Sequence, residues 1–398
     1  MEQRTVLRVA ARCAKLTAQF CVDSLAIVTT RANHHAEHVL LVRVDAIGDF
    51  VLWIDAAKAT VKNYKAQGKS VLLIANKVWA TWAEDLSIFD EVIPFDRKAF
   101  ESNLIYRFHF GRRMRRTGCS IAVQPTYSRE WLFGDALIRM SGAPERIGSQ
   151  GGTQNVRPWQ KRISDRWYTR LIAADPAHLM ELIRNAEFVR GLLDGNFRAK
   201  VADLRGLTAN RLDPAFTAAI PATQPYFVLV PGASWDGKEW SIENFIQVAE
   251  WLHDMTGWHG VVCGGDADRN LAEEACRRSS IPLLNWAGRT DLSQLSAILS
   301  DCRLLVTNDT SSAHIAAAVG APTVCVLGGG HYGRFMPYEV EQTDERPLPT
   351  AVVHHMPCFN CNWRCIYPRT EGKPVPCIDR VTVSQVILAI SQLLELNH

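Results

Sequence analysis

Short continuous runs of apolar residues alternate with longer stretches of helical spacing in the first part of this chain. The runs are rich in β-branched residues and are followed by turn-forming residues, which is typical of buried strands. We predict strands at residues 39–44, 70–75, 91–95 and 120–124. Because helical patterns separate these strands, residues 39–150 predict a parallel sheet with helices on both faces.

The second part of the chain repeats this alternation. Strands are predicted at residues 226–230, 260–263, 303–306 and 323–327. Helices are predicted at residues 242–255, 270–278, 292–299 and 312–319. The chain therefore predicts two doubly wound α/β domains, a class that binds ligands at the carboxyl ends of its strands.

Some segments lie outside this alternation. Residues 148–178 are rich in Gly, Arg and Trp without a clear period, which favours a long active-site loop. Residues 214–225 contain three prolines and predict a linker. Apolar positions from Leu7 to Phe20, with basic residues between them, predict an amphipathic helix. Such a helix packs on its own domain or rests on an anionic membrane surface.

These features divide the chain into four parts. We predict an N-terminal helical extension at residues 1–38 and a first α/β domain at residues 39–213. A second α/β domain is predicted at residues 214–378, followed by a C-terminal amphipathic helix at residues 379–398.

Composition restricts the class of protein. Of the 398 residues, 47% are hydrophobic and 21% are charged, a balance that excludes disordered and fibrous proteins. No uncharged apolar run reaches about 18 residues, which excludes a transmembrane bundle. Basic residues interrupt the apolar positions near the N-terminus, which is not typical of a secretory signal, so we expect a cytoplasmic protein.

The net charge of +3 is unevenly distributed. Residues 1–200 contain 30 Lys and Arg against 20 Asp and Glu, whereas the remaining residues contain 14 against 21. The first half therefore favours an anionic partner, although basic runs are also typical of a solvated face. The basic candidates are Arg112, Arg113, Arg115, Arg116, Arg157, Lys161, Arg162 and Arg166. No nucleic-acid-binding motif accompanies them, so we expect no nucleic-acid partner.

Gly48 and Asp49 directly follow the first predicted strand. Glycine allows a sharp turn into the helix, and the carboxylate of Asp49 then lies at the helix N-terminus. Asp49 is either an N-cap or a general base that takes a proton from an acceptor hydroxyl.

A loop from Pro231 to Trp240 follows the first strand of the second half. Gly232, Ala233 and Ser234 offer backbone N–H groups and a hydroxyl, and Lys238 adds a positive charge. This combination of groups is suited to bind a phosphate, although the spacing of a Walker loop is absent. The alternative is a glycine-rich turn on the surface.

A second polar loop joins a strand to a helix at residues 307–314. Asp309, Thr310 and Ser311 place side-chain oxygens and the N–H groups of a helix start at the strand ends, and His314 lies in the first turn. Capping of the helix by Asp309 or Thr310 is compatible with binding of a phosphate or a sugar.

Together these motifs resemble glycosyltransferase family 9, the ADP-heptose:lipopolysaccharide heptosyltransferases. The similarity runs from about residue 39 to residue 335 in the family's order and spacing. It implies a GT-B fold, with two Rossmann-like domains facing a cleft and a C-terminal helix that returns to the N-terminal domain. The N-terminal domain would bind the acceptor and the C-terminal domain the nucleotide sugar, with inverting transfer and no catalytic metal.

The resemblance also implies roles for particular residues. Asp49, beside Gly48, matches the family's general base. Ser234 and Lys238 match the positions that hold the donor diphosphate, and Lys238 would stabilise its developing charge. The other donor-binding positions are Ala233, Asp309, Thr310, Ser311 and His314.

The chain departs from the family pattern at three places. Ser311 stands where the family usually has Gly, and Asp55 where it usually has Pro. A Gly-Gly-Gly-His segment at residues 328–331 replaces the more usual Phe-Gly-Pro-Thr. Because Ser311 adds a Cβ close to the donor, the exact sugar stays open.

The implied reaction moves heptose from ADP-heptose to a lipopolysaccharide core or a related anionic glycolipid or glycan. The enzyme would then work on, or near, the inner face of the cytoplasmic membrane. The alternatives are a protein (autotransporter-type) heptosyltransferase, a transferase for another nucleotide sugar, and a non-catalytic nucleotide-sugar binder.

Four of the eleven cysteines lie close together near the C-terminus, at Cys358, Cys361, Cys365 and Cys377. Four thiolates suit a tetrahedral zinc or a single iron, which would be structural because no position stays open for substrate. Free thiols or labile disulfides are the alternative. A similar set of cysteines binds iron in the protein-modifying heptosyltransferases that are related to the family.

Overall fold

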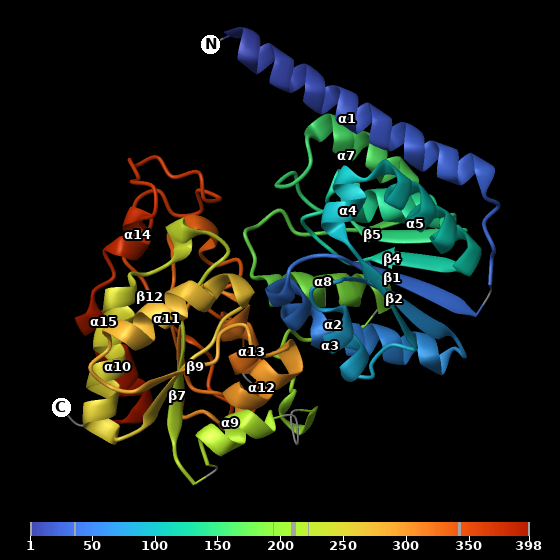
Figure 1. Ribbon diagram of the computed structural model, residues 1–398. Coiled ribbons are helices and arrows are strands. Elements are labelled where there is room, and N and C mark those ends of the chain that lie inside the picture. The colour runs from blue at the N-terminus through green and yellow to red at the C-terminus, as the bar shows by residue number, and fades with distance from the viewer. Residues whose placement is uncertain are drawn as a thin grey trace. The chain divides into compact units, whose positions relative to one another are not determined.

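A computed structural model describes residues 2–35, 37–193, 195–207, 212–221, 223–340 and 344–396 (Figure 1). The chain forms two compact units. Unit 1 consists of Met1–Ala46, Ala56–Ala177 and Arg184–Arg198. Unit 2 consists of Ile47–Asp55, His178–Ile183 and Ala199–His398.

Unit 1 is built on a six-stranded parallel sheet with the order β3-β2-β1-β4-β5-β6. The central strands β1, β2 and β4 are almost continuously buried, as expected for a parallel sheet covered on both faces. The strands are β1 (His38–Arg43), β2 (Ser70–Asn76), β3 (Glu91–Phe95), β4 (Ile121–Gln124), β5 (Glu145–Ser149) and β6 (Arg170–Ile172). This confirms the parallel sheet predicted from the sequence.

Helices cover both faces of this sheet (Figure 1). They are α2 (Ile47–Ala66), α3 (Ala80–Asp85), α4 (Arg97–Ser102), α5 (Leu104–Thr117), α6 (Ala136–Ser141), α7 (Pro158–Ser164) and α8 (Glu181–Leu193), with a π-helical turn η1 (Trp131–Asp135) and a 3-10 turn η2 (Asp165–Trp167). α5 begins where the Asn103 side chain accepts hydrogen bonds from the N–H groups of Ile105 and Tyr106, and it ends at Gly118 with φ of 70°.

The N-terminal extension forms one long helix, α1 (Glu2–Thr29), which packs against α5 and α6. Asp23 of α1 forms an ion pair with Arg107 of α5, in which Nε of Arg107 is 2.6 Å from Oδ1 of Asp23. Both side chains are almost completely buried. α1 is therefore held to unit 1 by a specific charged contact as well as by apolar packing.

Unit 2 contains a second six-stranded parallel sheet, with the order β12-β11-β10-β7-β8-β9. Its strands are β7 (Tyr226–Val230), β8 (His259–Val262), β9 (Leu283–Asn285), β10 (Leu304–Asn308), β11 (Thr323–Val326) and β12 (Thr350–Val352). Its helices are α9 (Pro214–Ala219), α10 (Ile242–Thr256), α11 (Arg269–Arg278), α12 (Leu292–Asp301), α13 (Ser311–Val319), α14 (Pro376–Asp379) and α15 (Val383–Leu394). Short turns are η3 (Arg205–Leu207), η4 (Asp236–Lys238), η5 (Asp266–Asp268) and η6 (Gly329–His331).

Two predictions about element order need correction. The expected loop at residues 148–178 contains the end of β5, all of α7 and η2, and the edge strand β6. The C-terminal helix, expected to return to the N-terminal domain, belongs to unit 2: α15 packs against α10, β11 and β12, and Val386 and Ile390 are buried in the core of that unit. The apolar face of α15 therefore completes the second domain.

The segment at residues 214–225, expected as a linker, begins with the short helix α9 instead of continuous coil. Asp213 caps this helix by accepting a hydrogen bond from the N–H of Ala215. Residue 222 of the segment lies outside the described residues. Among the helices that the structure describes, none combines the length and the apolarity needed to cross a membrane.

Candidate functional site

The structure places Gly48 and Asp49 in the first turn of α2, directly after the carboxyl end of β1. Ala46 is the N-cap residue, so the interpretation of Asp49 as the N-cap is wrong. A carboxylate in the first turn is stabilised by the positive end of the helix dipole. Asp49 is half-buried, and residues 47–55 belong to unit 2, as do all the donor-site candidates of the second half.

Lys238 lies at the end of η4, in the loop that follows β7. Its Nζ is 3.3 Å from Oδ2 of Asp309 and donates a 3.2 Å hydrogen bond to the carbonyl oxygen of Asp309. The side chains are only 13% and 7% exposed. The structure therefore brings together two of the predicted donor residues, from loops 71 residues apart in the sequence.

Asn308 ties these two loops to each other. Its Oδ1 accepts a 3.0 Å hydrogen bond from the N–H of Trp240, and its Nδ2 donates a 2.6 Å bond to the carbonyl oxygen of Pro231. Asn308 itself is fully buried. Because β7 and β10 are neighbours in the sheet, their carboxyl ends meet, and Asn308 fixes the backbone on both sides of Lys238.

The expected phosphate cradle has a carboxylate in contact with it. The N–H of Ala233 donates a 3.3 Å hydrogen bond to Oε1 of Glu239, and burial raises the pKa of Glu239. Ser234 is exposed to solvent. A backbone N–H that binds a carboxylate in the same loop has the orientation needed to bind an anionic oxygen.

The loop before α13 positions the remaining donor candidates. Thr310 is the N-cap residue of α13 but makes no side-chain capping bond, and Asp309 does not cap the helix either. Ser311, half-buried, is the first helical residue. The N–H groups of this first turn lie at the helix N-terminus, a position that favours a phosphate oxygen.

His314, predicted in the first turn of this helix, is buried there. Its Nδ1 lies 2.8 Å from the hydroxyl oxygen of Tyr338. Burial lowers the pKa of His314 to about 4, so the ring is neutral at physiological pH.

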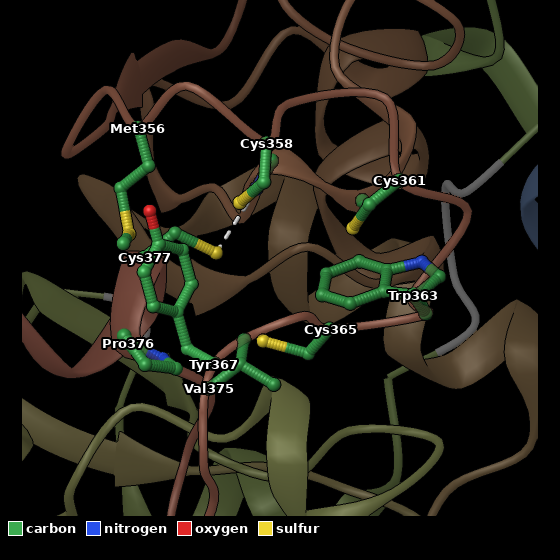
Figure 2. A pocket seen from close by; sticks show the side chains of 11 residues that line it. Met356, Cys358, Cys361, Trp363, Cys365, Tyr367, Val375, Pro376 and Cys377 are labelled. Carbon is green, nitrogen blue, oxygen red and sulfur yellow. Dashed lines mark hydrogen bonds between the residues drawn. The ribbon is translucent and has the colours of Figure 1, made fainter.

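The four clustered cysteines line one pocket in unit 2, together with Trp363 and Tyr367 (Figure 2). Figure 2 shows the side chains of Cys358 and Cys377 pointing toward each other, and those of Cys361 and Cys365 pointing toward the same space. The N–H of Gly329 donates a 3.4 Å hydrogen bond to Sγ of Cys377. No three His, Cys, Asp or Glu side chains within the described residues are arranged to hold a metal ion, so the predicted metal site is not supported by this arrangement.

The basic candidates of unit 1 separate into two groups. Arg115 is buried, and it donates hydrogen bonds to the carbonyl oxygens of Thr30 at 2.6 Å and Met140 at 3.2 Å. The guanidinium group of Arg115 is therefore engaged inside unit 1, which makes it a poor candidate for contact with an acceptor. Arg112 and Lys161 also have partners within unit 1, in Thr30 and Asp165. The exposed candidates are Arg113, Arg116, Arg157, Arg162 and Arg166.

Sequence reasoning did not select two residues that contact the predicted site. Asn308, in the polar loop at residues 307–314, is not among the predicted site residues, although a polar residue at the end of a buried strand is a usable signal. The second residue is Trp363, whose ring centroid is 4.7 Å from Nζ of Lys238. It belongs to the cysteine-rich segment, residues 358–377, which contains the four clustered cysteines. No local pattern in the sequence links Trp363 to Lys238.

Comparisons with known proteins agree with this architecture. The sequence profile of "Glycosyltransferase family 9 (heptosyltransferase)" matches residues 137–360. A lipooligosaccharide heptosyltransferase 2 of Haemophilus ducreyi is 32% identical over 114 residues, which are 27% of this chain and 32% of that protein. The chain thus matches about a third of the length of this curated relative.

Solved structures are similar over more of the chain. The Escherichia coli ADP-heptose lipopolysaccharide heptosyltransferase II has a TM-score of 0.65 at 16% identity, covering 90% of this chain and 98% of its own. The iron-containing dodecameric glycosyltransferase TibC of enterotoxigenic E. coli has a TM-score of 0.53 at 12% identity, covering 92% and 77%. These likenesses show the GT-B fold. The profile match covers more than half of the chain, which therefore belongs to glycosyltransferase family 9.

Proposed function

We propose that this protein is an inverting glycosyltransferase that moves heptose from ADP-heptose to a lipopolysaccharide core or a related anionic glycan. The pair of Lys238 and Asp309 carries the proposal, because it places a fixed ammonium group beside the N-terminus of α13 at the carboxyl ends of β7 and β10. A nucleoside diphosphate needs a cation and free backbone N–H groups together. The names of similar proteins, which include ADP-heptose, support the choice of donor.

In the proposed reaction, an acceptor hydroxyl attacks the anomeric carbon from the face opposite the diphosphate. Asp49 takes the hydroxyl proton, and the carbon–oxygen bond to the diphosphate breaks with inversion. Negative charge develops on the leaving diphosphate. Lys238 and the N–H groups of Thr310 and Ser311 stabilise that charge, so the reaction needs no catalytic metal.

The acceptor in this proposal is anionic, and unit 1 binds it. Five exposed basic side chains support this, and three of them, Arg157, Arg162 and Arg166, lie in α7 or next to it. Trp159 of α7 is 50% exposed and Ile163 is 39% exposed, beside these basic residues. Exposed tryptophan next to arginine is typical of surfaces that contact the headgroup region, so we include peripheral contact with the inner face of the cytoplasmic membrane.

We further propose that the four cysteines bind a structural zinc or iron, which would draw their thiols closer together than in the arrangement described above. The donor set suits either metal, and all four thiols line one pocket. The iron in the similar TibC structure supports the proposal. Metal analysis of the purified protein tests it: less than about 0.2 equivalents of zinc plus iron would overturn it, and Cys377→Ser is the matched variant expected to lose the metal.

The donor is tested by calorimetric titration with ADP-heptose beside UDP-, GDP- and CMP-sugars. Binding of ADP-heptose alone supports the proposal, and preference for another nucleotide sugar keeps the mechanism but replaces the donor. Binding of none of them contradicts it. Turnover separates the remaining alternatives: a non-catalytic binder forms no product from bound ADP-heptose, and a protein heptosyltransferase labels a polypeptide acceptor but not a lipopolysaccharide core.

A further inference from the structure

We infer that the cysteine-rich segment contributes to the donor site. Within this segment, Trp363 is a positioning residue that holds the ammonium group of Lys238. The inference rests on the proposed function for the nature of the ligand, a nucleoside diphosphate. It adds to the site Trp363, which belongs to none of the predicted motifs and lies beyond the end of the family profile at residue 360.

The first observation is the surroundings of the Lys238 ammonium. It lies 4.7 Å from the centroid of the Trp363 ring, while Asp309 contributes a carboxylate oxygen at 3.3 Å and a carbonyl oxygen at 3.2 Å. A lysine stem is flexible and loses rotamer entropy when it is fixed. An indole face attracts a cation without neutralising it, so Trp363 can hold the ammonium and leave its charge available to a phosphate.

The second observation is how Trp363 itself is held. Its Nε1 lies 3.3 Å from Nδ1 of His331, and Nε2 of His331 lies 2.6 Å from Oδ1 of Asn362. Asn360, Asn362 and Trp363 all have φ between 51° and 65°. A left-handed conformation is uncommon for a tryptophan and persists only where the surroundings impose it. The backbone of the turn between Cys361 and Cys365 therefore fixes the position of the Trp363 ring.

The third observation explains the three glycines that depart from the family pattern. A Cβ at Gly330 would lie 2.3 Å from the Trp363 ring, and a Cβ at Gly329 would lie 2.1 Å from the Phe359 ring. The N–H groups of Asn360 and Asn362 also donate hydrogen bonds to the carbonyl oxygens of Gly329, at 2.7 Å, and Gly330, at 3.0 Å. The glycines are thus required by the cysteine-rich segment, whose aromatic rings pack directly on their backbone.

The fourth observation is that the same segment also holds the backbone of the Lys238 loop. The N–H of Val375 donates a 2.9 Å hydrogen bond to the carbonyl oxygen of Gly237. The N–H of Gly372 donates a 2.9 Å bond to the carboxylate of Asp236, which also pairs with Arg369. The cysteine-rich segment therefore contacts three successive residues of the turn: the carboxylate of Asp236, the carbonyl group of Gly237 and the ammonium group of Lys238.

The test measures ADP binding by calorimetry, because this readout does not depend on turnover. We expect Trp363→Ala to weaken ADP binding by about 5- to 30-fold, the range of a desolvated cation–π contact, and Trp363→Phe to recover most of it. The matched control is Trp258→Ala. This change removes another partly buried indole of unit 2, which precedes β8 and so lies at the amino ends of the strands, away from the donor site. It should leave the affinity for ADP within about twofold of wild type.

A double-mutant cycle separates positioning of Lys238 from general damage to the loop. If Trp363 acts through Lys238, Trp363→Ala has little further effect on ADP binding in a Lys238→Ala background. Equal effects of Trp363→Ala in both backgrounds would overturn the inference, as would wild-type affinity of Trp363→Ala. Should Lys238→Ala bind too weakly for the cycle, failure of Trp363→Phe to rescue would overturn it instead. Absence of ADP binding by the wild-type protein would reject the proposed function itself.

Discussion

Two buried ion pairs, one in each unit, have different surroundings. In unit 1, Arg107 of α5 pairs with Asp23 of α1, 84 residues away in the sequence. In unit 2, Lys238 and Asp309 pair in loops at the strand ends. The first pair therefore holds two helices together, whereas the second lies where a parallel sheet binds its ligand.

The largest effect in a test of this comparison is expected at Asp49, whose carboxylate we assign to catalysis and not to the stability of the fold. Asp49→Asn should lower kcat by about 10²- to 10⁴-fold, because an amide cannot take the proton of the acceptor hydroxyl. ADP binding should stay within a few-fold of wild type. The measurement is transfer rate beside calorimetric affinity for ADP, and a variant that transfers at the wild-type rate would remove Asp49 from the mechanism.

The opposite result is expected for the buried ion pair of unit 1. Arg107→Ala leaves the carboxylate of Asp23 buried without its partner, which should lower the free energy of unfolding by about 3–5 kcal/mol. The matched control is Lys15→Ala on α1, the helix that carries Asp23, since the side chains of Lys15 and Glu101 are about half exposed. That change should cost at most about 1 kcal/mol. Denaturant unfolding measures both, and equal losses would mean that the buried pair does not hold α1.

Burial of His314 makes the free energy of unfolding depend on pH. Its pKa is about 4 in the folded protein, below the unfolded value near 6.5, so between these values the unfolded chain binds a proton that the folded chain does not. Stability therefore falls as the pH drops through this window, by up to about 3 kcal/mol. Unfolding at pH 7 and at pH 4.5 measures the difference. His314→Gln, which cannot titrate, should show a smaller loss over the same interval.

The sequence predicts the two regions unequally, and the reason is physical. Strands of a parallel sheet are buried on both faces, so their apolar runs are evident, and the loops after β7 and β10 follow from the position of those runs. The edge strands β6, β9 and β12 have only three residues each, too few to form a run that distinguishes them from coil. The contact of Trp363 with Lys238 joins segments more than 100 residues apart, so only the folded chain shows it.

Basic residues show the same limit of local patterns. Arg113, Arg115 and Arg116 are adjacent in the sequence, yet Arg115 faces the interior and the other two are exposed, because α5 turns about 100° per residue. The run alone does not separate a charge that stabilises the fold from a charge that is available to a partner. Burial on the helix decides which is which.

The smallest expected effect uses these neighbours directly. Arg115→Ala removes hydrogen bonds to two buried carbonyl groups and should lower the free energy of unfolding by about 1–3 kcal/mol without changing the affinity for ADP. The double variant Arg113→Ala/Arg116→Ala should leave stability within about 0.5 kcal/mol. If these exposed side chains contact an anionic acceptor, the double variant raises the acceptor KM a few-fold, and added salt reduces the difference. An unchanged KM at low salt would show that they form only a solvated face, and acceptor binding would then depend on the other exposed basic residues of unit 1.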